Sequence, residues 1–149
     1  MPEIIKGYDV PNILTFVVPV PHQDAVKDWA TAKRIFSETV RSIAAQDHAG
    51  WKVVIVANHG ADLPTLPECF EVKWVDFPPT FLPDIVDHDR FWDALRLDKG
   101  RRVLAGMLHA GNMGHAMVVD YDDLVSKRLT SFVAENQTAN GWYIANLFG

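Results

Sequence analysis

Two uninterrupted runs of apolar, mostly β-branched residues constrain the fold of this chain more than any other feature. Residues 13–20 read ILTFVVPV, and residues 52–57 read KVVIVA. Strands that are apolar on both faces are typical of parallel sheets whose two faces are covered by helices. Pro19, inside the first run, lacks a backbone N–H, so we expect the pairing of this strand to end there.

The remaining segments predict elements that alternate with these strands. The spacing of Trp29, Phe36, Val40 and Ile43 predicts a helix within residues 24–46. The alternating residues 71–77 predict a third strand nearer the edge of the sheet. The rest of the chain predicts the following elements in order: a loop over 78–89, a helix over 99–110 that stops at Gly111, a strand over 116–119, a helix over 124–136 and a strand over 142–147.

Strands that alternate with helices predict an α/β fold, a three-layer αβα sandwich with a mostly parallel central sheet. A length of 149 residues fits one domain, residues 1–149. In the helix expected over 124–136, Leu129, Phe132 and Val133 are predicted to point inward.

Composition excludes several classes of function. Lys and Arg number 14 against 19 Asp and Glu, and no basic run occurs, which argues against a nucleic-acid partner. Cys69 is the only cysteine, so an internal disulfide and a cysteine zinc cluster are excluded. The sequence shows no secretory signal pattern and no apolar run of about 20 residues, so we expect a cytoplasmic protein without a transmembrane segment.

Polar residues follow three of the predicted strands at the point where each strand ends. They are His22–Asp24, Asn58–Gly60 and Asp120–Asp122. Ligands of open α/β sheets bind beyond the carboxyl ends of the strands. The sequence therefore predicts that these three polar clusters meet on one rim.

The fourth strand ends in three carboxylates, Asp120, Asp122 and Asp123. Like charges this close repel one another, and a Mg²⁺ or Mn²⁺ ion would relieve the repulsion because hard cations prefer oxygen ligands. In extended backbone, Asp120 and Asp122 share a side and Tyr121 faces the other way. The alternative, which spacing alone favours, is that Asp122 or Asp123 caps a helix starting at Leu124. Both readings hold together if Asp123 caps and the other two face the metal.

The order of these features resembles the nucleotide-sugar-binding half of family-2-type, GT-A-fold glycosyltransferases. The resemblance covers roughly residues 13–123. It is carried by VPVPH at 18–22, SIAAQ at 42–46, VANHGAD at 56–62 and GHAMVVDYDD at 114–123. It implies a Rossmann-like nucleotide-diphospho-sugar transferase with an Asp-x-Asp motif.

The resemblance implies a metal-dependent, hexosyltransferase-type enzyme. Such an enzyme moves a sugar from a nucleotide-diphosphate donor, most often a UDP-sugar, to the hydroxyl of a saccharide or other acceptor. The implied metal, Mn²⁺ or Mg²⁺, is held first by Asp122, with Asp120 and Asp123 as further candidates. Residues expected to bind the donor are Pro19, His22, Asn58, Asp62, Lys99, Arg102 and Asp120.

Several of these residues have a second interpretation. Lys99, Arg101 and Arg102 are candidates for phosphate oxygens, but a solvated helix start is the alternative and is favoured for at least one of them. For Phe91 and Trp92 we expect core packing, with stacking on a base or sugar as the alternative.

The chain departs from the family pattern in two places. Ala57 stands where many members place an acid that contacts the base, and Asn58 or Asp62 is the expected substitute. The sequence ends at Gly149, before the half that binds the acceptor and supplies the catalytic base, so no catalytic residue is assigned. We therefore expect the donor-binding part of a longer enzyme.

Two other functions compete with the transferase. The first is a non-catalytic binding or assembly module that forms homo-oligomers through residues 142–145. The second is a metal-dependent phosphohydrolase. It ranks last because its nucleophilic Asp belongs after the first strand, where Pro21-His22-Gln23 stands.

Overall fold

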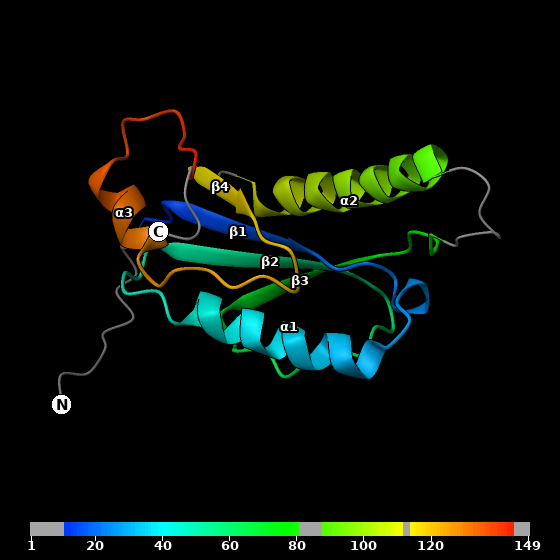
Figure 1. Ribbon diagram of the computed structural model, residues 1–149. Coiled ribbons are helices and arrows are strands. Elements are labelled where there is room, and N and C mark those ends of the chain that lie inside the picture. Colours follow the sequence, from blue (N-terminus) through cyan, green and yellow to red (C-terminus); the bar gives the residue numbers. More distant parts are fainter. Residues whose placement is uncertain (1–10, 81–87, 112–113, 145–149) are drawn as a thin grey trace.

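The computed structural model describes residues 11–80, 88–111 and 114–144. In chain order, the elements are β1 (Leu14–Pro19), the short 3₁₀ helix η1 (Gln23–Ala25), α1 (Trp29–Ala44), β2 (Trp51–Asn58), β3 (Phe70–Val75), α2 (His88–Ala110), β4 (His115–Val118) and α3 (Leu129–Glu135) (Figure 1).

Within the described residues, the strands form one four-stranded sheet in which every pairing is parallel, in the order β3-β2-β1-β4. The two apolar runs are the central strands β1 and β2. Pairing between β1 and β4 ends at Val17 and Val118, and the Val119 N–H then donates to the Val17 carbonyl at 2.9 Å. The Val20 N–H donates to the Val56 carbonyl of β2. Because the backbone groups of alternate residues point to opposite neighbouring strands, the Pro19 nitrogen, which carries no hydrogen, points to the β4 side. Pairing with β4 has already ended there.

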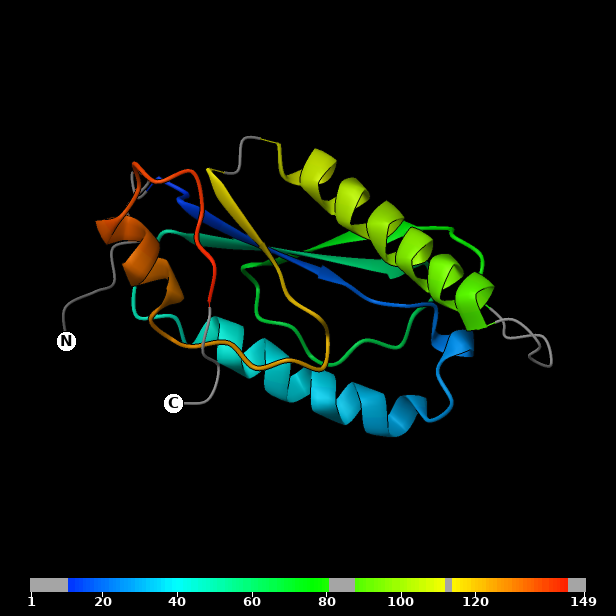
Figure 2. The ribbon, with the colours of Figure 1, turned by 45° about the horizontal axis from the view of Figure 1, so that its top comes forward.

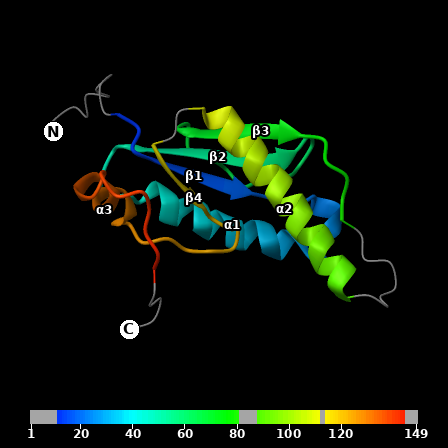
Figure 3. The ribbon, with the colours of Figure 1, turned by 90° about the horizontal axis from the view of Figure 1, so that it is seen from above.

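Helices cover both faces of this sheet, with α1 on one face and α2 on the other (Figure 1). Phe36, Val40 and Ile43 of α1 are buried in a core with alternate residues of β1 and β2. On the opposite face Val17, Val54 and Val56 pack against α2, which crosses the sheet as Figure 3 shows. The predicted three-layer αβα sandwich is confirmed, and the sheet is parallel throughout its described strands.

The helix predicted within residues 24–46 begins later than expected, at Trp29. Asp28 caps it, because its carboxylate accepts hydrogen bonds from the Thr31 backbone N–H at 3.1 Å and from the Thr31 hydroxyl at 2.6 Å. These two bonds, the hydroxyl bond first, lower the pKa of Asp28. Residues 23–25 form the separate helix η1.

The helix predicted over 99–110 begins at His88, so residues 88 and 89 are helical instead of belonging to the predicted loop. Residues 81–87 of that loop lie outside the described residues. The predicted stop is confirmed. Gly111 has φ +69°, and its N–H donates to the Met107 carbonyl at 3.2 Å.

None of the described helices is both long enough and apolar enough to cross a membrane.

The helix predicted over 124–136 is wrong at its start, because α3 begins at Leu129. Residues 121–128 instead run alongside α1 (Figure 2). Asp122 and Asp123 therefore cap no helix. Phe132 is another correction: it is 45% exposed and packs edge-on against Trp142, whereas Val133 is buried as predicted.

The predicted fifth strand is also wrong over residues 142–144, which belong to no strand. Trp142 packs against His115, with ring centroids 4.6 Å apart. The remainder of that prediction, residues 145–147, lies outside the described residues.

Candidate functional site

The order of the strands locates a natural binding crevice. The connection from β1 to β2 passes through α1 on one face, and the connection from β3 to β4 passes through α2 on the other. The strand order therefore reverses between β1 and β4. In open parallel sheets, ligands bind beyond the carboxyl ends of the strands at this reversal.

A pocket of about 430 Å³ lies at this position. Pro19 and Pro21 line it from the end of β1, and Asp120, Tyr121 and Asp122 line it from the end of β4. The residues of α2 that complete its wall are Trp92, Leu95, Asp98, Lys99 and Arg102. The structure thus brings five of the sequence-predicted site residues to one pocket: Pro19, Lys99, Arg102, Asp120 and Asp122.

A smaller pocket of about 200 Å³ lies on the same rim and contains other predicted residues. His22, Gln23 and Asp24 line it from η1 and its cap, and residues 58–61 line it from the end of β2. The three polar clusters therefore reach one rim but divide between two pockets.

The two carboxylates of the larger pocket have different surroundings. An oxygen of Asp120 lies 2.6 Å from the ammonium nitrogen of Lys99. Asp122 is exposed, and in the part of the chain that the structure describes it forms no ion pair. Asp123 is exposed and does not line the pocket, and its N–H closes a turn by donating to the Asp120 carbonyl at 3.1 Å.

Tyr121, between the two carboxylates, is directed toward α1. Its ring packs edge-on against Phe36, with centroids 6.1 Å apart, and its carbonyl accepts a hydrogen bond from the Thr39 hydroxyl at 2.8 Å. Partial burial raises the pKa of Tyr121, and the charges of Asp122 and Asp120 raise it further. The contacts of Tyr121 leave Asp120 and Asp122 on the pocket side of the turn.

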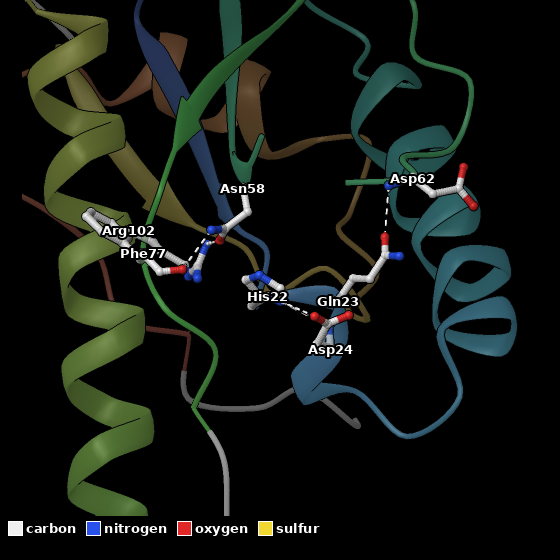
Figure 4. A network of polar contacts seen from close by, with 7 residues as sticks. All are labelled: His22, Gln23, Asp24, Asn58, Asp62, Phe77 and Arg102. Carbon is white, nitrogen blue, oxygen red and sulfur yellow. Dashed lines mark hydrogen bonds and ion pairs between the residues drawn. The ribbon is translucent and has the colours of Figure 1, made fainter. Parts of the chain in front are cut away.

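Arg102 lines the pocket and is 1% exposed. Its guanidinium donates two hydrogen bonds to Asp98, at 2.9 and 3.1 Å. It donates a third to the Asn58 side-chain oxygen at 2.8 Å, which Figure 4 shows. The amide of Asn58 donates in turn to the Phe77 carbonyl at 2.7 Å, and the guanidinium lies over the Phe77 ring. The hydrogen bond between Arg102 and Asn58 therefore joins α2 to the end of β2.

Two other predicted residues lie in local contacts of their own. Asp62 lines neither pocket. Its carboxylate pairs with Lys33 at 2.7 Å, and its N–H donates to the Gln23 side chain at 2.9 Å (Figure 4). His22 is half-buried, and its Nδ1 accepts the Asp24 N–H at 3.1 Å, which caps η1.

Sequence reasoning missed the contribution of the first half of α2, because it placed the helix start at residue 99. Trp92, Leu95 and Lys99 lie three and four residues apart, the spacing that puts side chains on one helix face. Asp98 and Arg102, at i and i+4, are a second signal of a helix that starts earlier.

Sequence reasoning also missed what positions the turn after β4. Three polar side chains from α1 and its C-terminal end form hydrogen bonds to residues 121–130. They are Thr39, Ser42 and Gln46. The Ser42 hydroxyl accepts the Val125 N–H at 3.2 Å. The Gln46 side chain donates to the Ser126 carbonyl at 2.8 Å and accepts from both the N–H and the hydroxyl of Thr130, at 3.0 and 2.9 Å. The segment that follows the two carboxylates is therefore held by α1.

The donor set of the larger pocket fits a hard divalent cation only if a ligand completes the coordination. In residues 11–80, 88–111 and 114–144, no group of three or more His, Cys, Asp or Glu side chains is arranged to hold a metal ion. Mg²⁺, however, is commonly bound through one or two carboxylates plus substrate phosphates. Asp122, with Asp120 beside it, meets that requirement.

Comparison with known proteins gives two distant structural similarities. No protein-family model matches the chain, and no curated protein matches it. Two solved structures of TarS from S. aureus, a glycosyltransferase, are similar. TarS 1–349 is 17% identical with a TM-score of 0.49, over 82% of this chain and 32% of that one. The other TarS chain is 16% identical with a TM-score of 0.43, over 82% of this chain and 19% of that one. The chain thus spans about a third and about a fifth of their lengths.

Proposed function

We propose that the chain is the donor-binding part of a GT-A-type glycosyltransferase and binds a nucleotide-diphosphate sugar in the larger pocket. The observation that carries this proposal is the pocket at the reversal of strand order, where two carboxylates and a lysine ammonium lie together. A diphosphate needs positive charge, which Lys99 offers directly and the carboxylates offer through a bound divalent cation. The order of motifs in the sequence supports a nucleotide sugar as the diphosphate ligand.

In the proposed reaction, the bond between the anomeric carbon and the diphosphate breaks, and a bond from that carbon to an acceptor oxygen forms. Asp122 holds the Mn²⁺ or Mg²⁺ ion, with Asp120 as its second carboxylate. When bound, such an ion supplies charge that stabilises the departing diphosphate. Lys99 pairs with a phosphate oxygen, and Trp92 and Leu95 provide an apolar wall. Transfer also needs a general base for the acceptor proton, and we assign none to this chain.

Thermal unfolding in the presence of nucleoside diphosphates tests the proposal. We expect UDP, GDP or another nucleoside diphosphate to raise the Tm in the presence of Mn²⁺ but not in its absence. A ligand at 100 times its Kd stabilises a folded protein by about 2.7 kcal/mol. Asp122→Asn should abolish the Mn²⁺-dependent rise. The matched control is Asp123→Asn, one residue away and outside the pocket lining, which should keep it. The proposal fails if no nucleoside diphosphate stabilises the protein through Mn²⁺, or if Asp122→Asn responds like the wild type.

A binding or assembly module without catalysis is the second candidate, and one observation favours it. Tyr143 and Ile144 are exposed beside the half-buried Leu129, near the end of the described chain. Exposed apolar side chains of this kind are typical of association surfaces. Transfer of a sugar from a bound donor to an acceptor would distinguish the transferase from this alternative.

A further inference from the structure

Lys99 and Asp120 form an ion pair at the wall of the larger pocket. The pair joins α2 to the end of β4 at 2.6 Å, and the two side chains are 49% and 42% exposed. Lys99 is thus placed where a divalent cation bound to Asp120 would compete with it for the same carboxylate.

The two basic residues of the pocket differ in their freedom to move. Arg102 is buried, with its guanidinium fixed between Asp98 and Asn58. Lys99 carries a compact charge on a flexible stem, is half-exposed and, among the described residues, pairs with one carboxylate, that of Asp120. A half-exposed pair of this kind costs little to open.

We propose that Lys99 occupies Asp120 in place of a divalent cation while the pocket holds no ligand, and that it leaves Asp120 for a phosphate oxygen when a diphosphate binds. This inference rests on the proposed function. It adds that Lys99 couples the two ligands. Without a diphosphate, Lys99 competes for Asp120 and weakens cation binding. With a diphosphate, Lys99 is drawn away and Asp120 is released.

Coupling of this kind is reciprocal. If a diphosphate increases the affinity for Mn²⁺ by some factor, Mn²⁺ increases the affinity for the diphosphate by the same factor. Lys99 then disfavours a half-filled site that holds the cation alone. A purely structural pair between Lys99 and Asp120 would add nothing to the coupling that direct contact between the cation and the diphosphate supplies.

The first test is titration of the protein with Mn²⁺ alone, with free Mn²⁺ followed by electron paramagnetic resonance. Lys99→Met removes the ammonium but keeps a long side chain. We expect it to bind Mn²⁺ about two- to five-fold more tightly than the wild type, the range that corresponds to an exposed ion pair. Arg101→Met is the control for net charge, because Arg101 is exposed on the same helix and does not line the pocket. It should leave the Mn²⁺ affinity unchanged.

Repeating the titration with UDP tests the coupling. UDP should tighten Mn²⁺ binding in the wild type and in Arg101→Met, by a factor that is smaller in Lys99→Met. If Lys99→Met binds Mn²⁺ no more tightly than Arg101→Met, the inference is overturned while the proposed function stands. If the wild type and both variants bind no Mn²⁺ with or without UDP, both are overturned.

A second test examines the ion pair without any metal. Acylation of lysines, read by mass spectrometry, should modify Lys99 slowly in the wild type and faster in Asp120→Asn. Lys27, which is exposed, serves as the internal reference and should react equally in both proteins. Equal reactivity of Lys99 in the two proteins would show that the pair does not hold in solution, and would overturn the inference whatever the Mn²⁺ titrations give.

Discussion

At the scale of single residues, Arg102 has the clearest assignment. Its side chain satisfies Asp98 and Asn58 at once and lies over the Phe77 ring. Removing one partner of a buried ion pair leaves the other charge without compensation, which is far more costly than the pair is worth. The first role of Arg102 is therefore to join α2 to the sheet beneath the pocket.

We predict that Arg102→Met lowers the free energy of unfolding by about 3 kcal/mol. This is the lower end of the range for breaking a buried pair, because Asp98 keeps some contact with solvent. Urea denaturation measures the loss. Arg101→Met, on the exposed face of the same helix, should change stability by no more than about 0.5 kcal/mol. Equal stabilities of the two variants would contradict the role assigned to Arg102.

At the scale of elements, the distance between α2 and the sheet depends on Gly106. A Cβ placed there would lie 2.6 Å from Val17 Cγ1 and 2.9 Å from Val56 Cγ2, closer than real contacts allow. Gly100, about one and two-thirds turns earlier on the same helix, has nothing within 4 Å of such a Cβ. The two glycines thus form a matched pair for one substitution.

Gly106→Ala should lower the free energy of unfolding by about 1–3 kcal/mol, because overpacking moves the helix or the two valines. Gly100→Ala should raise it by about 0.5–1 kcal/mol, because alanine favours a helix over glycine. Thermal and urea unfolding of both variants measure the two effects. Gly106→Ala as stable as Gly100→Ala would show that the packing of α2 does not depend on Gly106.

The start of α3 depends on a residue outside that helix. Arg128 stands at its N-cap without a side-chain hydrogen bond, and Gln46 accepts the Thr130 N–H instead. Gln46→Ala should lower the free energy of unfolding by about 1–3 kcal/mol, since it removes two partly buried hydrogen bonds to Thr130 and an exposed one to the Ser126 carbonyl. Hydrogen exchange should show faster exchange of the Thr130 amide.

Gln137 provides the control for that substitution. Its amide bonds only to the Ala134 carbonyl within the described residues, at an exposed position. Gln137→Ala should leave exchange at Thr130 unchanged. If Gln46→Ala also leaves it unchanged, the cap supplied by Gln46 is not what fixes the start of α3.

At the scale of the whole molecule, the sequence was sufficient where burial alone decides the structure. The runs that became β1 and β2 are apolar at nearly every position, and only the centre of a covered parallel sheet accommodates two such runs. The position of the rim followed from the ends of those strands. The mostly parallel sheet and the three layers were therefore predictable before any contact was known, whereas the order of the strands was not.

The parts that sequence reasoning got wrong depend on contacts between distant segments. The first half of α2 carries exposed apolar residues such as Leu97 on its outer face, so its pattern did not distinguish it from a loop. The cap of α3 comes from Gln46, 84 positions before Thr130. Lys99, Arg101 and Arg102 are all basic, so their residue type does not distinguish them. The orientation of the helix about its axis decides that Arg102 is buried and that Lys99 reaches Asp120.

The buried hydrogen bond from Arg102, which lines the larger pocket, to Asn58 has a consequence for how such a site evolves. Pro21 and the two aspartates of the pocket lie in the connections that follow β1 and β4, whereas Arg102 is tied to the packed layers. Under the proposed function, substitutions in those connections would change the ligand that is bound while the packed layers keep their stability. Ligand preference would then change separately from the stability of the fold. A few substitutions after β1 and β4 would be enough to change the ligand.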